Sequence, residues 1–117
     1  MTHKDLDVWK RSVIFVTSIY AITKSFPKDE IYGLTSQIRR SAVSIPSNIA
    51  EGGARKSKIE FRQFLYISLG SAAELETQLL IATNLNILEV EESTALIEEL
   101  NSISRMLQGL IKSLNIS

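Results

Sequence analysis

The side chains of this sequence that are best suited to bind a ligand are basic residues gathered between positions 39 and 62. They are Arg39, Arg40, Arg55, Lys56, Lys58 and Arg62. Only two carboxylates, Glu51 and Glu60, lie in the same stretch, so its net charge is +4. Clustered cations bind phosphates, so this stretch predicts contact with nucleic acid. The alternative is a solvated loop whose cations pair with the two carboxylates, and the zero net charge of the whole chain favours it.

Polar side chains also recur at helical spacing in the same region. The row has spacings of 3, 4, 4 and 3 and consists of Gln37, Arg40, Ser44, Asn48 and Glu51. Further along the chain, Glu74 and Gln78 form an i, i+4 pair. We interpret these residues as a polar network that sets the register between two helices or across a subunit interface. The alternative is a solvated stripe.

The residues needed for catalysis or metal binding are scarce. The chain has no cysteine, and its single histidine, His3, lies near the N-terminus. A di-metal site in a helix bundle needs two Glu-x-x-His pairs, and glycine-rich phosphate loops need spacings that are absent here. A lysine could act as a base, but nothing singles one out. We therefore expect no enzyme activity, no metal and no cofactor.

Four segments carry apolar residues at alternating spacings of three and four, which is typical of helices. They cover approximately residues 6–25, 32–53, 57–84 and 91–114. The short connections favour antiparallel neighbours. At 117 residues the chain is predicted to form one all-α domain over 1–117, an up-down-up-down antiparallel four-helix bundle. No run of about 18 apolar residues could span a membrane, and the lack of cysteine fits a cytoplasmic protein.

Several residues are expected to mark helix ends. Asp5 or Asp7 is positioned to cap the first helix. Ser57 and Glu60 have the spacing of a capping box at the start of the third, which should end at Asn84 to Asn86.

The second segment contains two helix-breaking features. Pro46 predicts a kink or a break because it lacks a backbone donor. The Gly52-Gly53 pair predicts the C-terminal stop.

The first segment has a second apolar row beside its core row, formed by Trp9, Val13, Val16 and Tyr20. A helix that is apolar on two flanks has more surface to bury than one partner covers. The row predicts an oligomer interface anchored by Trp9 and Tyr20, since aromatic residues are enriched at interfaces. The alternative is that both residues complete the monomer core.

Charge is distributed unevenly along the chain. Residues 1–66 carry eleven Lys/Arg against six Asp/Glu, a net of +5, whereas residues 67–117 carry two against seven, a net of −5. This asymmetry indicates either an interaction surface or complementary charge between neighbouring helices or subunits.

Several runs of residues resemble one protein family over approximately residues 5–85. They are Asp7-Val8-Trp9-Lys10, Phe26-Pro27, Glu30-Ile31-Tyr32-Gly33-Leu34, Gln37-Ile38-Arg39-Arg40, Ser44-Ile45-Pro46-Ser47-Asn48-Ile49-Ala50-Glu51-Gly52 and Glu74-Leu75-Glu76-Thr77-Gln78-Leu79. The chain resembles the bacterial four-helix-bundle proteins encoded in intervening sequences of 23S ribosomal RNA genes, also labelled S23 ribosomal proteins. The resemblance implies a homo-pentamer around a central channel and no established enzymatic activity.

A related member of that family, the accessory variability protein of diversity-generating retroelements, binds a reverse transcriptase and nucleic acid through a basic surface. The resemblance carries this role to Arg39, Arg40, Arg55 and Lys56. We therefore expect a non-enzymatic oligomeric adaptor that binds RNA or an RNA–protein complex. The rival interpretation is a protein-interaction scaffold without nucleic-acid affinity.

Overall fold

The computed structural model describes residues 2–116, apart from the side chain of Asp5. These residues form four α-helices and two short 3-10 helices, without a strand. The elements are η1 (His3–Asp5), α1 (Asp7–Thr23), η2 (Lys28–Glu30), α2 (Leu34–Gly53), α3 (Lys58–Asn84) and α4 (Val90–Ser113). The predicted all-α class is confirmed, and each α-helix begins and ends within two residues of its predicted bounds.

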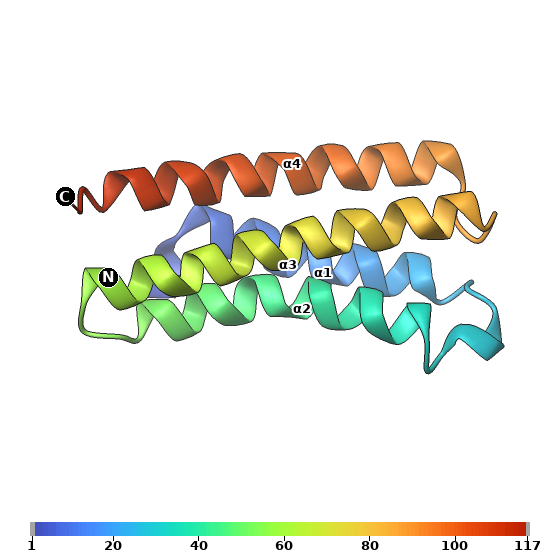
Figure 1. Cartoon of the computed structure of the whole chain (residues 1–117), viewed down its shortest axis with the longest axis horizontal. Helices are drawn as coiled ribbons and strands as arrows, with labels where there is room; N and C mark the ends of the chain where they lie inside the picture. Colours follow the sequence, from blue (N-terminus) through green and yellow to red (C-terminus); the bar gives the residue numbers. More distant parts are fainter. Residues whose placement is uncertain (1, 117) are drawn as a thin grey trace.

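The four α-helices lie side by side along the long axis of a molecule measuring 45 × 23 × 21 Å (Figure 1). α1 packs beside α2 and α4, and α3 packs beside the same two helices. The connections between consecutive helices lie at alternating ends of the molecule (Figure 1). This arrangement is compatible with the predicted up-down-up-down order. No helix in the described part of the chain is long and apolar enough to cross a membrane.

The core is formed by the apolar rows that face the bundle axis. Because each row recurs every three or four residues, one side of each helix is buried continuously. The largest side chains with almost no exposure are Ile19, Ile38, Ile45, Ile49, Leu65, Leu75, Leu79, Leu100, Ile103 and Leu107.

Both predicted ends of α3 are confirmed. The Ser57 hydroxyl accepts a hydrogen bond from the Glu60 backbone N–H at 3.1 Å and donates to its carboxylate at 3.3 Å. After Asn84, the backbone at Asn86 has a φ of 60°, a left-handed conformation that asparagine tolerates. The N–H of Ile87 then donates to the carbonyl of Ala82 at 2.9 Å, which satisfies a helix-end acceptor.

The predicted cap of α1 is wrong for Asp7, and the side chain of Asp5 lies outside the described part. Leu6 occupies the N-cap position, without a side-chain hydrogen bond, and Asp7 is the first helical residue. Leu6 packs against the core, and its N–H donates to the carbonyl of His3 in the preceding turn at 3.1 Å. Apolar packing of this turn replaces a polar cap.

The two helix-breaking features of α2 have different outcomes. The helix continues through Pro46, so of the predicted kink or break, the break is wrong. The helix ends at Gly53, as the Gly52-Gly53 pair predicted, although the next residue, Ala54, keeps right-handed helical geometry. Gly52 is buried where a Cβ atom would lie 2.7 Å from the Cβ of Phe64. The glycine therefore serves the close approach of α2 and α3.

Candidate functional site

The seam between α2 and α3 is lined by short polar side chains that bond to one another. The hydroxyls of Ser44 and Ser71 lie 2.8 Å apart, and the Ser41 hydroxyl donates to Glu74 Oε1 at 3.2 Å. Asn48 donates its amide to the backbone carbonyl and the hydroxyl of Ser44, at 2.8 and 2.9 Å. Small serines let the two helices approach closely, and their hydroxyls are satisfied across the seam. Of the predicted network, Ser44, Asn48 and Glu74 therefore form hydrogen bonds in this seam.

A cavity of about 230 Å³ opens beside these hydrogen bonds. Its lining residues are Gln37, Arg40, Ser41, Ser44, Glu74 and Gln78. Gln78 is only 7% exposed, and its buried Oε1 has no hydrogen-bond partner among the described residues. Glu51, the last member of the predicted row, lies apart from the cavity and pairs with Arg55 at 3.2 Å.

Arg39 and Arg40 lie on different sides of α2, because consecutive residues of a helix are about 100° apart around its axis. Arg39 is half-buried on the α1 side, where its Nε donates to the Thr23 hydroxyl at 2.8 Å. Its guanidinium carbon lies 4.6 Å from the centre of the Tyr20 ring. Arg40 is exposed and faces the α2–α3 cavity. The two arginines do not form one surface.

The other four cations lie around the loop between α2 and α3. Arg55 is held there by Glu51 at 3.2 Å and Glu60 at 3.9 Å, and it covers the ring of Phe64 at 5.0 Å. The remaining cations form no ion pair or hydrogen bond with other described residues: Lys56, Lys58 and Arg62. We call these three residues the basic loop group.

The six predicted cations therefore do not form one patch. From Arg39 to the end of α2 the helix rises by about 1.5 Å per residue, which separates Arg39 from the loop by about 20 Å. The six cations are close in sequence, but the length of α2 places Arg39 and Arg40 far from the four cations near the loop.

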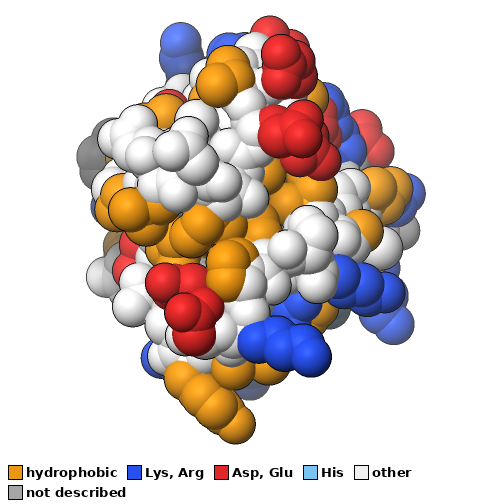
Figure 2. All heavy atoms as spheres, turned by 90° about the vertical axis from the view of Figure 1, so that its right-hand side faces the viewer, with side chains coloured by type: hydrophobic (Ala, Val, Ile, Leu, Met, Phe, Trp, Pro, Cys, Tyr) orange, Lys and Arg blue, Asp and Glu red, His pale blue; other side chains and the backbone are white. Residues whose placement is uncertain are grey.

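The opposite end of the bundle, with η2 and the α3–α4 connection, carries charges of both signs. Figure 2 shows this end with apolar side chains at its centre, Lys and Arg side chains at lower right, and Asp and Glu side chains at separate places. A second cavity of about 220 Å³ lies between the end of α1 and the start of α2, lined in part by Lys24, Lys28 and Arg39. The sequence did not indicate this cavity, because Lys24 and Lys28 lie outside the basic stretch of residues 39–62.

The predicted interface row on α1 is only partly free. Trp9 and Val16 pack against the core, and the Trp9 ring contacts the His3 ring edge-on at 5.1 Å between centroids. Val13 is 39% exposed, whereas Tyr20, at 40%, lies beneath Arg39.

A larger apolar surface that sequence analysis missed lies on the outward side of α3. Its exposed members are Ile59, Tyr66, Ile67, Leu80 and Ile81. We call them the outer α3 face. The signal was present in the sequence, because the apolar residues of α3 are not confined to the side that faces the core.

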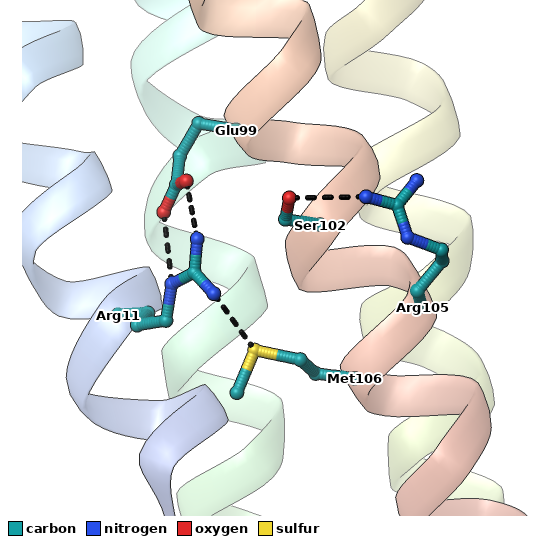
Figure 3. A network of polar contacts seen from close by, with 5 residues as sticks. All are labelled: Arg11, Glu99, Ser102, Arg105 and Met106. Carbon is teal, nitrogen blue, oxygen red and sulfur yellow. Dashed lines mark hydrogen bonds and ion pairs between the residues drawn. The ribbon is translucent and has the colours of Figure 1, made fainter.

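α1 and α4 are joined by one charged contact (Figure 3). The Arg11 guanidinium donates to both carboxylate oxygens of Glu99, at 3.2 and 2.5 Å, and a third N–H lies 3.4 Å from the sulfur of Met106. The hydrogen bond and charge of Glu99 raise the pKa of Arg11 above its ordinary value. This contact joins two helices at the surface and holds no group poised for catalysis.

No group of three or more His, Asp or Glu side chains that could hold a metal ion occurs among residues 2–116. On α2 and α3, Glu51 and Glu60 form ion pairs with Arg55, whereas Glu74 accepts a hydrogen bond from Ser41 in the α2–α3 seam.

Comparisons with known proteins agree with this architecture. Residues 4–109 match the model of the family described as 23S rRNA-intervening sequence protein. A crystal structure from Bacteroides thetaiotaomicron, of a protein with unknown function from the S23 ribosomal protein family, is similar at 26% identity and a TM-score of 0.80. The match covers 90% of this chain and 98% of that one. No curated protein matches the sequence. The chain belongs to the 23S rRNA-intervening sequence protein family.

Proposed function

We propose that this protein is a non-enzymatic oligomeric adaptor of the cytoplasm, built as an antiparallel up-down-up-down bundle, that binds RNA through the α2–α3 loop. The observation that carries the proposal is the basic loop group. Lys56 and Lys58 are exposed and Arg62 half-exposed, and none of them is neutralised by a carboxylate among the described residues. The family's description, which links it to an rRNA intervening sequence, supports RNA as the partner.

The surroundings of the loop suit a phosphate backbone. Arg55 pairs with two carboxylates, whereas Lys56 and Lys58 are exposed and have no carboxylate partner among the described residues. Lys58 is the first residue of α3, a helix of 27 residues, whose N-terminus carries partial positive charge. Cations and this helix end together favour an anion at the same place.

The test is a charge reversal within the basic loop group. We expect the double variant Lys56→Glu, Lys58→Glu to bind a labelled single-stranded RNA at least about tenfold more weakly, because two phosphate contacts become repulsive. Fluorescence anisotropy at about 50 and 200 mM salt should also show a salt slope smaller in magnitude by about 1.4, since each contact with a single strand contributes about 0.7.

The matched control makes the same charge change on α4, with Arg105→Glu and Lys112→Glu. Both side chains are exposed, and Arg105 bonds only to Ser102 on its own helix. The control should keep wild-type affinity. If both variants lose the same RNA affinity, the effect comes from net charge and not from the loop. Unchanged affinity in the loop variant would refute the proposed interface.

A second candidate, a protein-interaction scaffold without RNA affinity, is favoured by the outer α3 face. Its five apolar side chains, each 44–56% exposed, run along most of α3. Both candidates are oligomers, so we expect this face to join copies of the chain in either, and the RNA titration above separates the two. Light scattering on a sizing column should give a multiple of 13.1 kDa, and Tyr66→Lys with Leu80→Lys should return it to 13.1 kDa.

The apolar row on α1 provides the comparison variant. If Val13→Lys dissociates the oligomer and the α3 variant does not, the interface lies on α1 instead. A wild-type mass of 13.1 kDa would remove the oligomer from the proposal.

A further inference from the structure

We propose that the cavity between α2 and α3 binds a small zwitterion, a molecule of the free amino-acid class with one carboxylate and one ammonium group. This site is separate from the basic loop group and goes beyond RNA binding. It is carried by the complementary charges of Arg40 and Glu74, by the buried amide of Gln78 and by the size and lining of the cavity.

Arg40 and Glu74 line the same cavity, yet no ion pair joins them. The Arg40 guanidinium makes no hydrogen bond with another described residue, and the Glu74 carboxylate receives only the hydroxyl of Ser41, on Oε1. A guanidinium binds a carboxylate through two parallel hydrogen bonds, and a carboxylate accepts from an ammonium group. A ligand that carries both charges would therefore bridge the two side chains.

Gln78 supplies the inner end of the site. Arg40 and Glu74 are exposed, whereas Gln78 is 93% buried, since its exposed fraction is 7%. Its Oε1 is buried without a donor, which is unfavourable for a polar atom. The terminal torsion of a glutamine side chain is broad, so its amide can turn toward a ligand at low cost. An ammonium group has three N–H donors, enough for both Glu74 and the Gln78 oxygen.

The dimensions of the cavity restrict the ligand. An engineered cavity of about 150 Å³ holds benzene, so 230 Å³ admits a small amino acid. All six lining residues are polar, and none is aromatic. Charged and amide side chains on every side favour a small polar ligand that carries its own charges.

The direct test follows the side-chain amide signals of Gln78 and Gln37 by NMR during titration of the intact protein with glycine and with L-alanine. We expect saturable shifts of the Gln78 amide with both. Propionate lacks the ammonium group of alanine and ethylamine lacks its carboxylate, so each should bind at least about tenfold more weakly, since each loses one charged partner.

Variants identify the two charged partners. Glu74→Gln and Arg40→Met should each weaken alanine binding by about tenfold or more, whereas Arg105→Met, an exposed arginine on α4, should not change it. Circular dichroism verifies that each variant is helical. Failure of glycine and alanine to shift the Gln78 amide, equal binding of propionate, or wild-type affinity in both variants would overturn the proposal. The titration contains no RNA, so its outcome is independent of the RNA-binding proposal.

Discussion

The two seams that α2–α3 and α1–α4 form are built differently. Along α2–α3, glycine and serine bring the backbones close, and serine hydroxyls bond across the contact, as with Ser68, which donates to the Ile45 carbonyl at 2.9 Å. Along α1–α4, apolar packing is supplemented by the single surface ion pair of Arg11 and Glu99 (Figure 3). The polar cavity and the basic loop group both belong to the tighter seam.

One pair of helices in this fold is aligned by specific hydrogen bonds, whereas another is held mainly by apolar packing. Hydrogen bonds that need specific partners define the register of α2 against α3, and register determines where Arg40, Glu74 and Gln78 meet. Apolar packing of α4 completes the core and tolerates small displacements better. Substitutions that push two helices apart should therefore lower the free energy of unfolding most when they lie between α2 and α3.

The largest expected effect comes from adding one methyl group in each region. Gly52→Ala should destabilise the protein, because overpacking costs about 1–3 kcal/mol and exceeds the gain of about 1 kcal/mol from replacing a helical glycine. Gly109→Ala in α4 meets nothing within 4 Å and should stabilise by about 0.5–1 kcal/mol. Urea unfolding measures both. Stabilisation by Gly52→Ala would show that α2 and α3 are less closely packed than described.

A smaller effect is expected from one hydrogen bond of the tight seam. Ser68→Ala should lower the free energy of unfolding by about 1 kcal/mol, because the fully buried hydroxyl loses its bond to Ile45 on α2. Thr77→Ala on the same helix removes an exposed hydroxyl bonded to its own helix and should change stability by less than about 0.5 kcal/mol. Equal effects would remove the distinction between bonds across the seam and bonds within a helix.

The smallest effect should come from the α1–α4 contact. Arg11→Met keeps an apolar stem but removes the ion pair with Glu99, and it should lower the urea midpoint less than Ser68→Ala does. The difference from wild type should shrink as salt is added, since both groups are partly exposed. Arg105→Met is the control. An effect larger than that of Ser68→Ala, or one unaffected by salt, would contradict the comparison.

Much of the fold was predictable from the sequence because it depends on local patterns. The rows spaced by three and four residues placed the helices, and the Ser57–Glu60 spacing located the start of α3, since a capping box involves only neighbours in sequence. The cap of α1 was not predictable, because Leu6 is chosen by packing against residues distant in sequence.

The sites were harder to predict than the helices for the same reason. Sequence spacing put Gln37, Arg40, Glu74 and Gln78 forward as a network but could not show that a cavity separates them. It grouped Arg39 with Lys56, although the length of α2 separates them. The helix stop at Gly52-Gly53 was predictable, whereas the close approach of Gly52 to Phe64 was not, because Phe64 lies on the next helix.

The most direct test of the central claim, that the α2–α3 loop binds RNA through the basic loop group, is the salt dependence of RNA affinity. Three phosphate contacts with single-stranded RNA predict a slope of log affinity against log salt of about −2. Anisotropy on sized wild-type protein should show this steep fall, and the slope should approach zero when Lys56, Lys58 and Arg62 are replaced by glutamine. No binding at low salt, or a wild-type slope retained by that triple variant, would contradict the account.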